Sequence, residues 1–139
     1  MVESIESMMT RNPVCLSADA SLVDAAKAMD EHNIGDVLVL DNGTLCGIVT
    51  DRDIAIRAVA RGADPASVRL GEICSRDLVT LNAVAAIEDA MVRMREHAIR
   101  RMPVLDRGQP VGIVSLGDLA AERDRGSLLG KISTAPANH

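Results

Sequence analysis

Two segments built on the same plan carry the residues whose types and spacing could do chemistry. They read GIVTDRD at 47–53 and GIVSLGD at 112–118. In each, a hydroxyl residue stands three positions before an aspartate, which is the pattern of a capping box at the start of a helix. The same pattern suits a phosphate-bearing ligand. Free N–H groups at a helix N-terminus attract anions, and the carboxylate could accept hydrogen bonds from two adjacent sugar hydroxyls. The residues alone leave capping and ligand binding both open.

A glycine opens each of these segments. Gly47 and Gly112 carry no side chain, so a ligand or another stretch of backbone could approach closely there. Thr50 and Asp53 are the candidate ligand contacts of the first segment, and Ser115 and Asp118 are those of the second.

The two segments belong to an internal repeat. Residues 11–55 overlay residues 76–120 without a gap, and 20 of the 45 positions are identical, where chance would give about three. One copy is too small to hold a good core alone, so we expect two copies related by pseudo-twofold symmetry. We predict a first repeat at 8–62, a linker and lead-in at 63–72, a second repeat at 73–126 and a partly disordered tail at 127–139.

The hydrophobic pattern predicts the order β-α-β-β-α in each copy, an α/β (α+β) fold whose two repeats pack sheet to sheet. A Ser21–Asp24 capping box starts the first helix, and Leu22, Ala25, Ala26 and Met29 form its buried face. The predicted first-copy ranges are strands 13–16, 36–40 and 45–49, a turn at 41–43, and a second helix from Thr50 to about Arg61, stopped by Gly62. In the second copy they are strands 79–81, 102–105 and 111–114, a turn at 106–108, and helices at 87–97 and from about 116.

Two details distinguish the copies. Ala86 stands where the first copy has Ser21, which removes a helix cap and should cost about 1 kcal/mol of local stability. Leu70 and Ile73 match Ile5 and Met8 in register, so each copy begins with a short apolar lead-in that we expect to pack on its neighbour.

Composition excludes several classes of protein. The net charge of −5 and the absence of Phe, Tyr and Trp argue against a nucleic-acid reader. No apolar run is long enough to cross a bilayer, and the first residues lack the plan of a secretory signal, so we expect a cytoplasmic protein away from the membrane. Cys15, Cys46 and Cys74 are interpreted as small buried hydrophobes, although an intermolecular disulfide stays open.

No grouping in the sequence indicates catalysis. We find no Ser-His-Asp or Cys-His arrangement, no paired carboxylates and no glycine-rich phosphate loop, so we expect neither an enzyme nor a required cofactor. His32 and His97 fall in the last turn of a predicted helix, where they favour its dipole, and we expect no metal site.

The sequence resembles a tandem CBS module, the paired repeat named after cystathionine β-synthase. The resemblance rests on the internal repeat, the element order, the segment MPVLD at 102–106 and the two hydroxyl–aspartate segments in register. The resemblance runs from about Met8 to about Glu122. It implies adenosine-nucleotide binding in clefts between paired repeats, with Thr50 or Ser115 near phosphate and ribose and Asp53 or Asp118 on the ribose diol. It also implies aliphatic contacts to the purine from Val14 and Val37 in one site and from Val79, Met102 and Pro103 in the other.

The resemblance further implies that the two sites differ. Arg100 and Arg101 precede the second strand of the second copy, and Arg101 fits a position at which the family often places a basic residue facing phosphate. The first copy has Gly35 and Asp36 there, and it has VLV at 37–39 in place of MPV. We therefore expect tighter nucleotide binding by the second site.

These features together predict a regulatory module that binds AMP, ADP or ATP, forms a homodimer and acts through ligand-linked conformational change in that dimer or on a protein partner. S-adenosyl methionine and NAD are alternative ligands that the sequence does not separate. The alternative function is a ligand-free interaction dimer of the stress-response kind.

Overall fold

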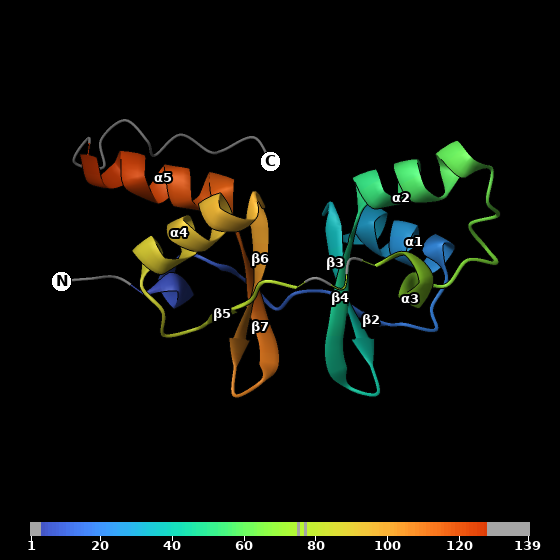
Figure 1. The fold of residues 1–139 in the computed structure, drawn as a ribbon, viewed down its shortest axis with the longest axis horizontal. Coiled ribbons are helices and arrows are strands. Elements are labelled where there is room, and N and C mark those ends of the chain that lie inside the picture. Colours follow the sequence, from blue (N-terminus) through green and yellow to red (C-terminus); the bar gives the residue numbers. More distant parts are fainter. Residues whose placement is uncertain (1–3, 75, 77, 128–139) are drawn as a thin grey trace. The chain divides into compact units, whose positions relative to one another are not determined.

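The computed structural model describes residues 4–74, 76 and 78–127, so all but the first residue of the predicted tail lies outside the described residues. The chain divides into two compact units. We call Pro13–Leu78 the first-repeat unit. The second-repeat unit combines the chain up to Asn12 with the chain from Val79 onward. Each is a small sheet with its helices gathered on one face (Figure 1).

The first-repeat unit holds a three-stranded sheet in the order β2-β3-β4. Strand β2 (Cys15–Ser17) runs parallel to β3 (Asp36–Asp41), and helix α1 (Leu22–His32) makes the crossover between them. Strand β4 (Thr44–Thr50) returns antiparallel to β3 and leads into α2 (Asp51–Arg57), the 3₁₀ turn η2 (Val59–Arg61) and α3 (Leu70–Ile73).

The second-repeat unit repeats this plan and adds a strand. Its sheet has the order β1-β7-β6-β5, with β5 (Leu81–Asn82) parallel to β6 (Arg101–Asp106) and β7 (Gln109–Ser115) antiparallel to β6. Helix α4 (Ile87–His97) is the crossover and α5 (Leu116–Ser127) follows β7. Strand β1 (Thr10–Arg11), preceded by the 3₁₀ turn η1 (Ile5–Ser7), pairs antiparallel with β7. The predicted mixed α/β class is confirmed.

Local sequence explains where the elements begin and end. Asn42 and Gly43 both have positive φ, as the tight turn between β3 and β4 requires. Asn33 takes the left-handed conformation that ends α1, and Ala98 takes the same conformation at the end of α4. Gly62, with φ of +71°, ends η2. The predicted stop at Gly62 is therefore confirmed.

Two predicted details are wrong. The helix after Thr50 does not run unbroken to Arg61, because α2 ends at Arg57, and Ala58 has φ and ψ of −120° and −64°, outside the helical region. Ala26 is exposed, whereas Leu22, Ala25 and Met29 are buried, so the apolar stripe of α1 is narrower than predicted.

The apolar lead-ins complete the cores of their neighbours, as the sequence predicts. Ile5 and Met9 are buried among residues of the second repeat, whereas Leu70 and Ile73 are buried among residues of the first. Methionine contributes to both cores of a chain that has no aromatic residues, and Met29, Met94 and Met102 are all buried. Within the described ranges, no helix combines the length and apolarity that a bilayer span requires.

Candidate functional site

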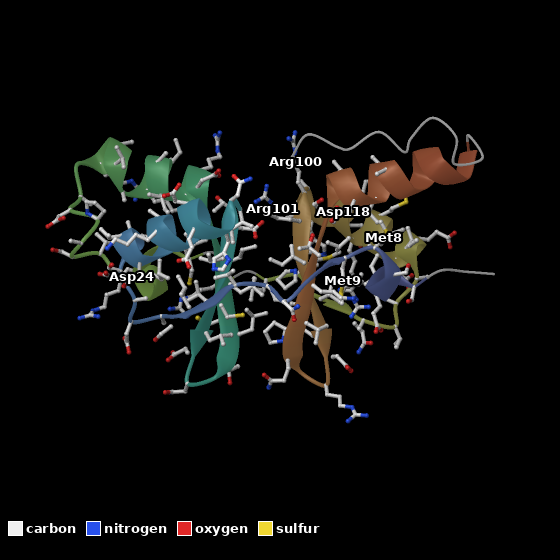
Figure 2. All side chains as sticks on the ribbon, turned by 180° about the vertical axis from the view of Figure 1, so that it is seen from behind. Met8, Met9, Asp24, Arg100, Arg101 and Asp118 are labelled. Atoms are coloured by element: carbon white, nitrogen blue, oxygen red, sulfur yellow. The ribbon has the colours of Figure 1, made fainter. Side chains whose placement is uncertain are left out.

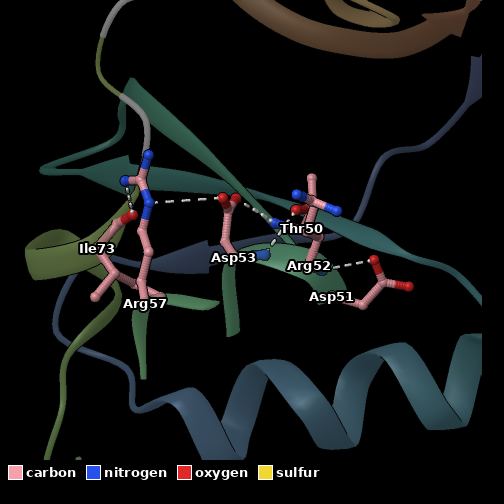
Figure 3. A network of polar contacts seen from close by, with 6 residues as sticks. All are labelled: Thr50, Asp51, Arg52, Asp53, Arg57 and Ile73. Atoms are coloured by element: carbon pink, nitrogen blue, oxygen red, sulfur yellow. Dashed lines mark hydrogen bonds and ion pairs between the residues drawn. The ribbon is translucent and has the colours of Figure 1, made fainter. Parts of the chain in front are cut away.

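Both hydroxyl–aspartate segments form capping boxes where a strand turns into a helix. We call these places the first corner (Thr50–Asp53) and the second corner (Ser115–Asp118). In the first, the Asp53 N–H donates to Thr50 Oγ1 (3.1 Å) and the Thr50 N–H donates to Asp53 Oδ2 (2.8 Å), as Figure 3 shows. In the second, the matching distances are 3.1 Å and 3.0 Å for Asp118 and Ser115. The capping interpretation is confirmed at both corners.

Each corner also bonds to the residue that comes before the middle strand of its sheet. The Asp51 N–H donates to the Gly35 carbonyl (3.0 Å), and the Leu116 N–H donates to the Arg100 carbonyl (2.7 Å). In the strand register Arg101 stands opposite Ser115. These contacts bring the four polar residues predicted for the second site to one edge of the second-repeat unit, where Figure 2 labels Arg100, Arg101 and Asp118.

The aspartates of the two corners have different neighbours. Asp53 Oδ1 lies 3.8 Å from Nε of Arg57, one helical turn further along α2. Arg57 also donates from Nη1 to the Ile73 carbonyl (2.8 Å), which holds its guanidinium beside the aspartate (Figure 3). The sequence carries Glu122 at the position equivalent to Arg57. The second repeat therefore has an acidic residue, not an arginine, at the equivalent position in the sequence.

Charge separates the corners further. Around the first stand three carboxylates, Asp36, Asp51 and Asp53, and two arginines, Arg52 and Arg57. Around the second stand one carboxylate, Asp118, and two arginines, Arg100 and Arg101, and the residue after Ser115 is the uncharged Leu116. A phosphate would meet more negative charge at the first corner and more positive charge at the second.

The aliphatic residues predicted to hold a purine fall into two groups. Val37 and Met102 have no exposed surface and belong to the cores of their units, whereas Val14 and Val79 are half-buried. The Val14 carbonyl accepts a hydrogen bond from the Leu38 N–H (2.9 Å). The equivalent hydrogen bond to the Val79 carbonyl cannot form, because the residue equivalent to Leu38 is Pro103, which has no N–H. Pro103 therefore leaves the Val79 carbonyl without that backbone partner.

The sequence left open whether a ligand or another backbone segment approaches Gly112, and the structure favours the backbone segment. A Cβ there would lie 2.5 Å from the Met9 sulfur and 2.8 Å from the Thr10 carbonyl oxygen. The close approach is therefore that of another backbone segment, the lead-in strand β1.

Other groups that could do chemistry are dispersed. His, Cys, Asp and Glu side chains in the described part of the chain form no group of three or more that could hold a metal ion. A cavity of about 600 Å³ lies against α4, and its lining includes Leu81, Asp89, Arg93 and His97. None of the residues predicted to bind nucleotide lines this cavity.

Sequence reasoning missed two features of the corners. One is the hydrogen bond from the start of each helix to the carbonyl of Gly35 or Arg100. It depends on backbone geometry, which residue types do not indicate. The Arg57–Asp53 ion pair did leave a signal, because an aspartate and an arginine four residues apart face each other on a helix.

Comparison with known proteins identifies the class. The sequence matches the CBS domain family over residues 2–59 and 70–125, and the chain belongs to this family. The CBS domain-containing protein YhcV of Bacillus subtilis is 39% identical over 136 residues, which cover 95% of this chain and 96% of YhcV. Proteins built on CBS pairs are in general regulatory or signalling modules rather than enzymes.

Two solved structures show the same pair of domains. The crystal structure of Hypoxic Response Protein I with two coordinated zinc ions is 34% identical, has a TM-score of 0.76 and matches 85% of this chain and 97% of that one. The CBS domain pair of protein MJ0100, solved with 5′-methylthioadenosine and S-adenosyl-L-methionine, is 27% identical, has a TM-score of 0.78 and matches 92% and 99% of the two chains.

Proposed function

We propose that this protein is a regulatory module that binds an adenine nucleotide at the second corner and performs no reaction on it. AMP, ADP and ATP are the ligands we favour. Asp118 accepts hydrogen bonds from the ribose hydroxyls, Ser115 donates to phosphate, and Arg100 and Arg101 neutralise the phosphate charge. The observation that carries the proposal is the gathering of these four residues at one edge of the second-repeat unit.

Three further observations support the choice. Helix α5 is twelve residues long, so its N-terminus offers a developed dipole, whereas α2 has seven residues. The Val79 carbonyl lacks the backbone donor that Val14 has, so it could accept from the exocyclic amine of adenine. The CBS pair of MJ0100 was solved with two adenosine compounds, which makes the adenosine moiety the common element.

The first corner is the weaker site in this proposal. Asp53 is already paired with Arg57, and the surrounding carboxylates repel phosphate. Thr50, Val14 and Val37 stay part of a predicted second pocket that would favour a nucleoside over a nucleotide.

Calorimetric titration with AMP, ADP, ATP, NAD, S-adenosyl methionine and 5′-methylthioadenosine tests the proposal. We expect Asp118→Asn to weaken nucleotide binding about 10- to 100-fold, the range of a hydrogen bond to a charged group, and to weaken it more than Asp53→Asn does. Arg101→Gln should weaken the binding of phosphorylated ligands but not the binding of methylthioadenosine. Asp106→Asn, at the exposed end of β6, is the matched control.

Absorbance offers an independent check. Because the chain has no Trp or Tyr, the purified protein barely absorbs at 280 nm, and a band near 260 nm that survives gel filtration indicates bound nucleotide. No heat with any of the six ligands, together with no such band, would overturn the proposal in favour of a ligand-free interaction module.

We also propose that the module is a homodimer joined through α2 and η2. No side chain of α2 or η2 is buried, and Ile56 and Val59 are 50% and 63% exposed. Large apolar side chains on adjacent turns form a face that a second copy could cover. The dimer would read the ligand by linkage, and an unidentified protein partner could do so in its place.

Sedimentation velocity tests the dimer. Ile56→Asp and Val59→Asp should shift the protein from dimer to monomer, because each buries a charge in the interface. Val84→Asp is the control, since Val84 is 78% exposed in the other unit. A monomeric parent, or a dimer that Val59→Asp leaves intact, would contradict this assignment.

A further inference from the structure

Two of the three cysteines meet in the first-repeat unit. Cys74 is buried at the end of α3, and Cys46 on β4 is half-buried against the same apolar cluster. Cys46 lies near enough to Cys74 to help raise the pKa of the Cys74 thiol. They come from segments 28 positions apart in sequence, so the fold rather than the local chain brings them together.

The strand geometry explains why Cys46 reaches this position. In the β3–β4 ladder Leu45 pairs with Leu40 and Gly47 pairs with Val39, which leaves Cys46 as the extra residue of a β-bulge. A bulge redirects the side chain of its extra residue.

The internal repeat provides a comparison within the same chain. At the shift of 65, Cys46 corresponds to Val111 and Cys74 corresponds to Met9. Met9 is buried at the matching bulge of β7, and its sulfur would lie 2.5 Å from a Cβ at Gly112, next to Val111. The fold therefore brings these two positions together in both units, but only the first-repeat unit has a thiol at each.

We propose that Cys46 and Cys74 form a reversible dithiol–disulfide site within one chain, oxidised by a peroxide or by a small disulfide. Cys46 is the point of entry because it is the more exposed of the two. This proposal does not depend on nucleotide binding, because neither cysteine belongs to a corner.

The chemistry balances with one peroxide. The Cys46 thiol gives its proton to solvent, and the thiolate attacks a peroxide oxygen. The O–O bond breaks, and the departing hydroxide takes up a proton, so that a sulfenic acid and one water form. The Cys74 thiolate then attacks the Cys46 sulfur, the S–S bond forms, and the S–O bond breaks to release a second water. Burial raises the pKa of the Cys74 thiol, and the adjacent Cys46 raises it further, while Arg76 lowers it. Closure should therefore accelerate as pH rises, and the increase should continue above the ordinary pKa of a thiol.

The test uses the full chain, oxidised with hydrogen peroxide or with oxidised glutathione and then denatured for thiol counting. Three thiols should fall to one, with an intact-mass loss of about 2 Da and no dimer, and dithiothreitol should restore all three. Peptide mapping should find Cys46 joined to Cys74. Cys15→Ser, the matched control, should still close the bond.

Neither Cys46→Ala nor Cys74→Ala should lose 2 Da under the same treatment. Cys46→Ala should keep two thiols, whereas Cys74→Ala should stop at a sulfenic acid or a mixed disulfide on Cys46, seen as a gain in intact mass. Far-UV circular dichroism tests whether each variant is folded. If Cys74→Ala does not fold, Cys46→Ala alone tests the proposal. The proposal is overturned if the folded parent keeps three thiols, if Cys15 enters the bond, or if the bond joins two chains.

Discussion

At the scale of single residues, the two oxygens of a corner aspartate have separable tasks. Oδ2 of Asp53 and of Asp118 accepts the N–H of the residue that begins the cap. Oδ1 of Asp53 faces Arg57, whereas the equivalent arginine is missing from the second repeat. The carboxylate holds a helix start at both corners, and the Arg57 contact at the first is the reason we propose that Asp118, rather than Asp53, accepts the sugar hydroxyls.

A capping aspartate outside the corners shows how such bonds affect titration. The backbone N–H of Ser21 donates to Asp24 Oδ2 (3.0 Å), and this bond, followed by the Ser21 side chain, lowers the pKa of Asp24 below its ordinary value. Because the pKa is lower in the folded state, the bond stabilises the fold above the unfolded-state pKa. That stabilisation is lost as pH falls through the folded-state value.

We predict that Ser21→Ala raises the pKa of Asp24 only part of the way to its ordinary value. The hydroxyl is lost, but the backbone N–H, the larger cause, stays. Titration of the side-chain carboxyl carbon by NMR measures the shift, with Ser17→Ala as a control outside the cap. An unchanged Asp24 midpoint, or one fully restored, would show that the assigned order of causes is wrong.

At the scale of elements, α1 and α4 are the same helix with and without a hydroxyl cap. Ser21 and Ala86 have closely similar backbone angles, and in both cases an aspartate at the third helical position accepts the cap N–H. The Ala86 N–H reaches Asp89 Oδ2 at 3.3 Å, longer than the 3.0 Å of the first copy.

Ala86→Ser should therefore stabilise the protein by up to about 1 kcal/mol, because it offers the Asp89 N–H a side-chain acceptor besides the Ala86 carbonyl that it already reaches (3.1 Å). Ser21→Ala should destabilise it by a similar amount. Urea unfolding of both variants measures the changes in the free energy of unfolding. If Ala86→Ser proves neutral while Ser21→Ala is destabilising, the two helix starts are not equivalent in solution.

The same elements show what the sequence could predict. The bounds 87–97 of α4 are correct to the residue because the repeat carries over the pattern of α1, whose ends Ser21 and Asn33 mark locally. Strand β1 was not predicted, because it has two exposed polar residues and depends on pairing with β7 about a hundred positions away. The corners were found since a hydroxyl and an aspartate three apart are a local pattern, whereas the closeness of Arg101 to Ser115 depends on strand register.

At the scale of the whole molecule, the core to which a segment belongs is not always that of the repeat nearest to it in sequence. The residues before Pro13 belong with the second repeat, and Leu70 and Ile73, which lead toward the second repeat, belong with the first. Ile5 donates its N–H to the Ala85 carbonyl (2.9 Å) and has no exposed surface, so it is bonded as well as packed in the second-repeat unit. Each unit therefore needs a segment that lies next to the other repeat in sequence.

This exchange predicts where a core mutation acts. Ile5→Ala should destabilise the second-repeat unit by about 2–5 kcal/mol, the range for truncating a buried isoleucine, although Ile5 precedes the first repeat in sequence. Leu70→Ala is the matched variant and should act on the first-repeat unit. Hydrogen exchange read by mass spectrometry should therefore show faster exchange at 79–121 in Ile5→Ala and at 13–74 in Leu70→Ala. The opposite pattern, with faster exchange in the first repeat for Ile5→Ala and in the second for Leu70→Ala, would contradict this prediction. Each lead-in would then belong to the repeat that follows it in sequence.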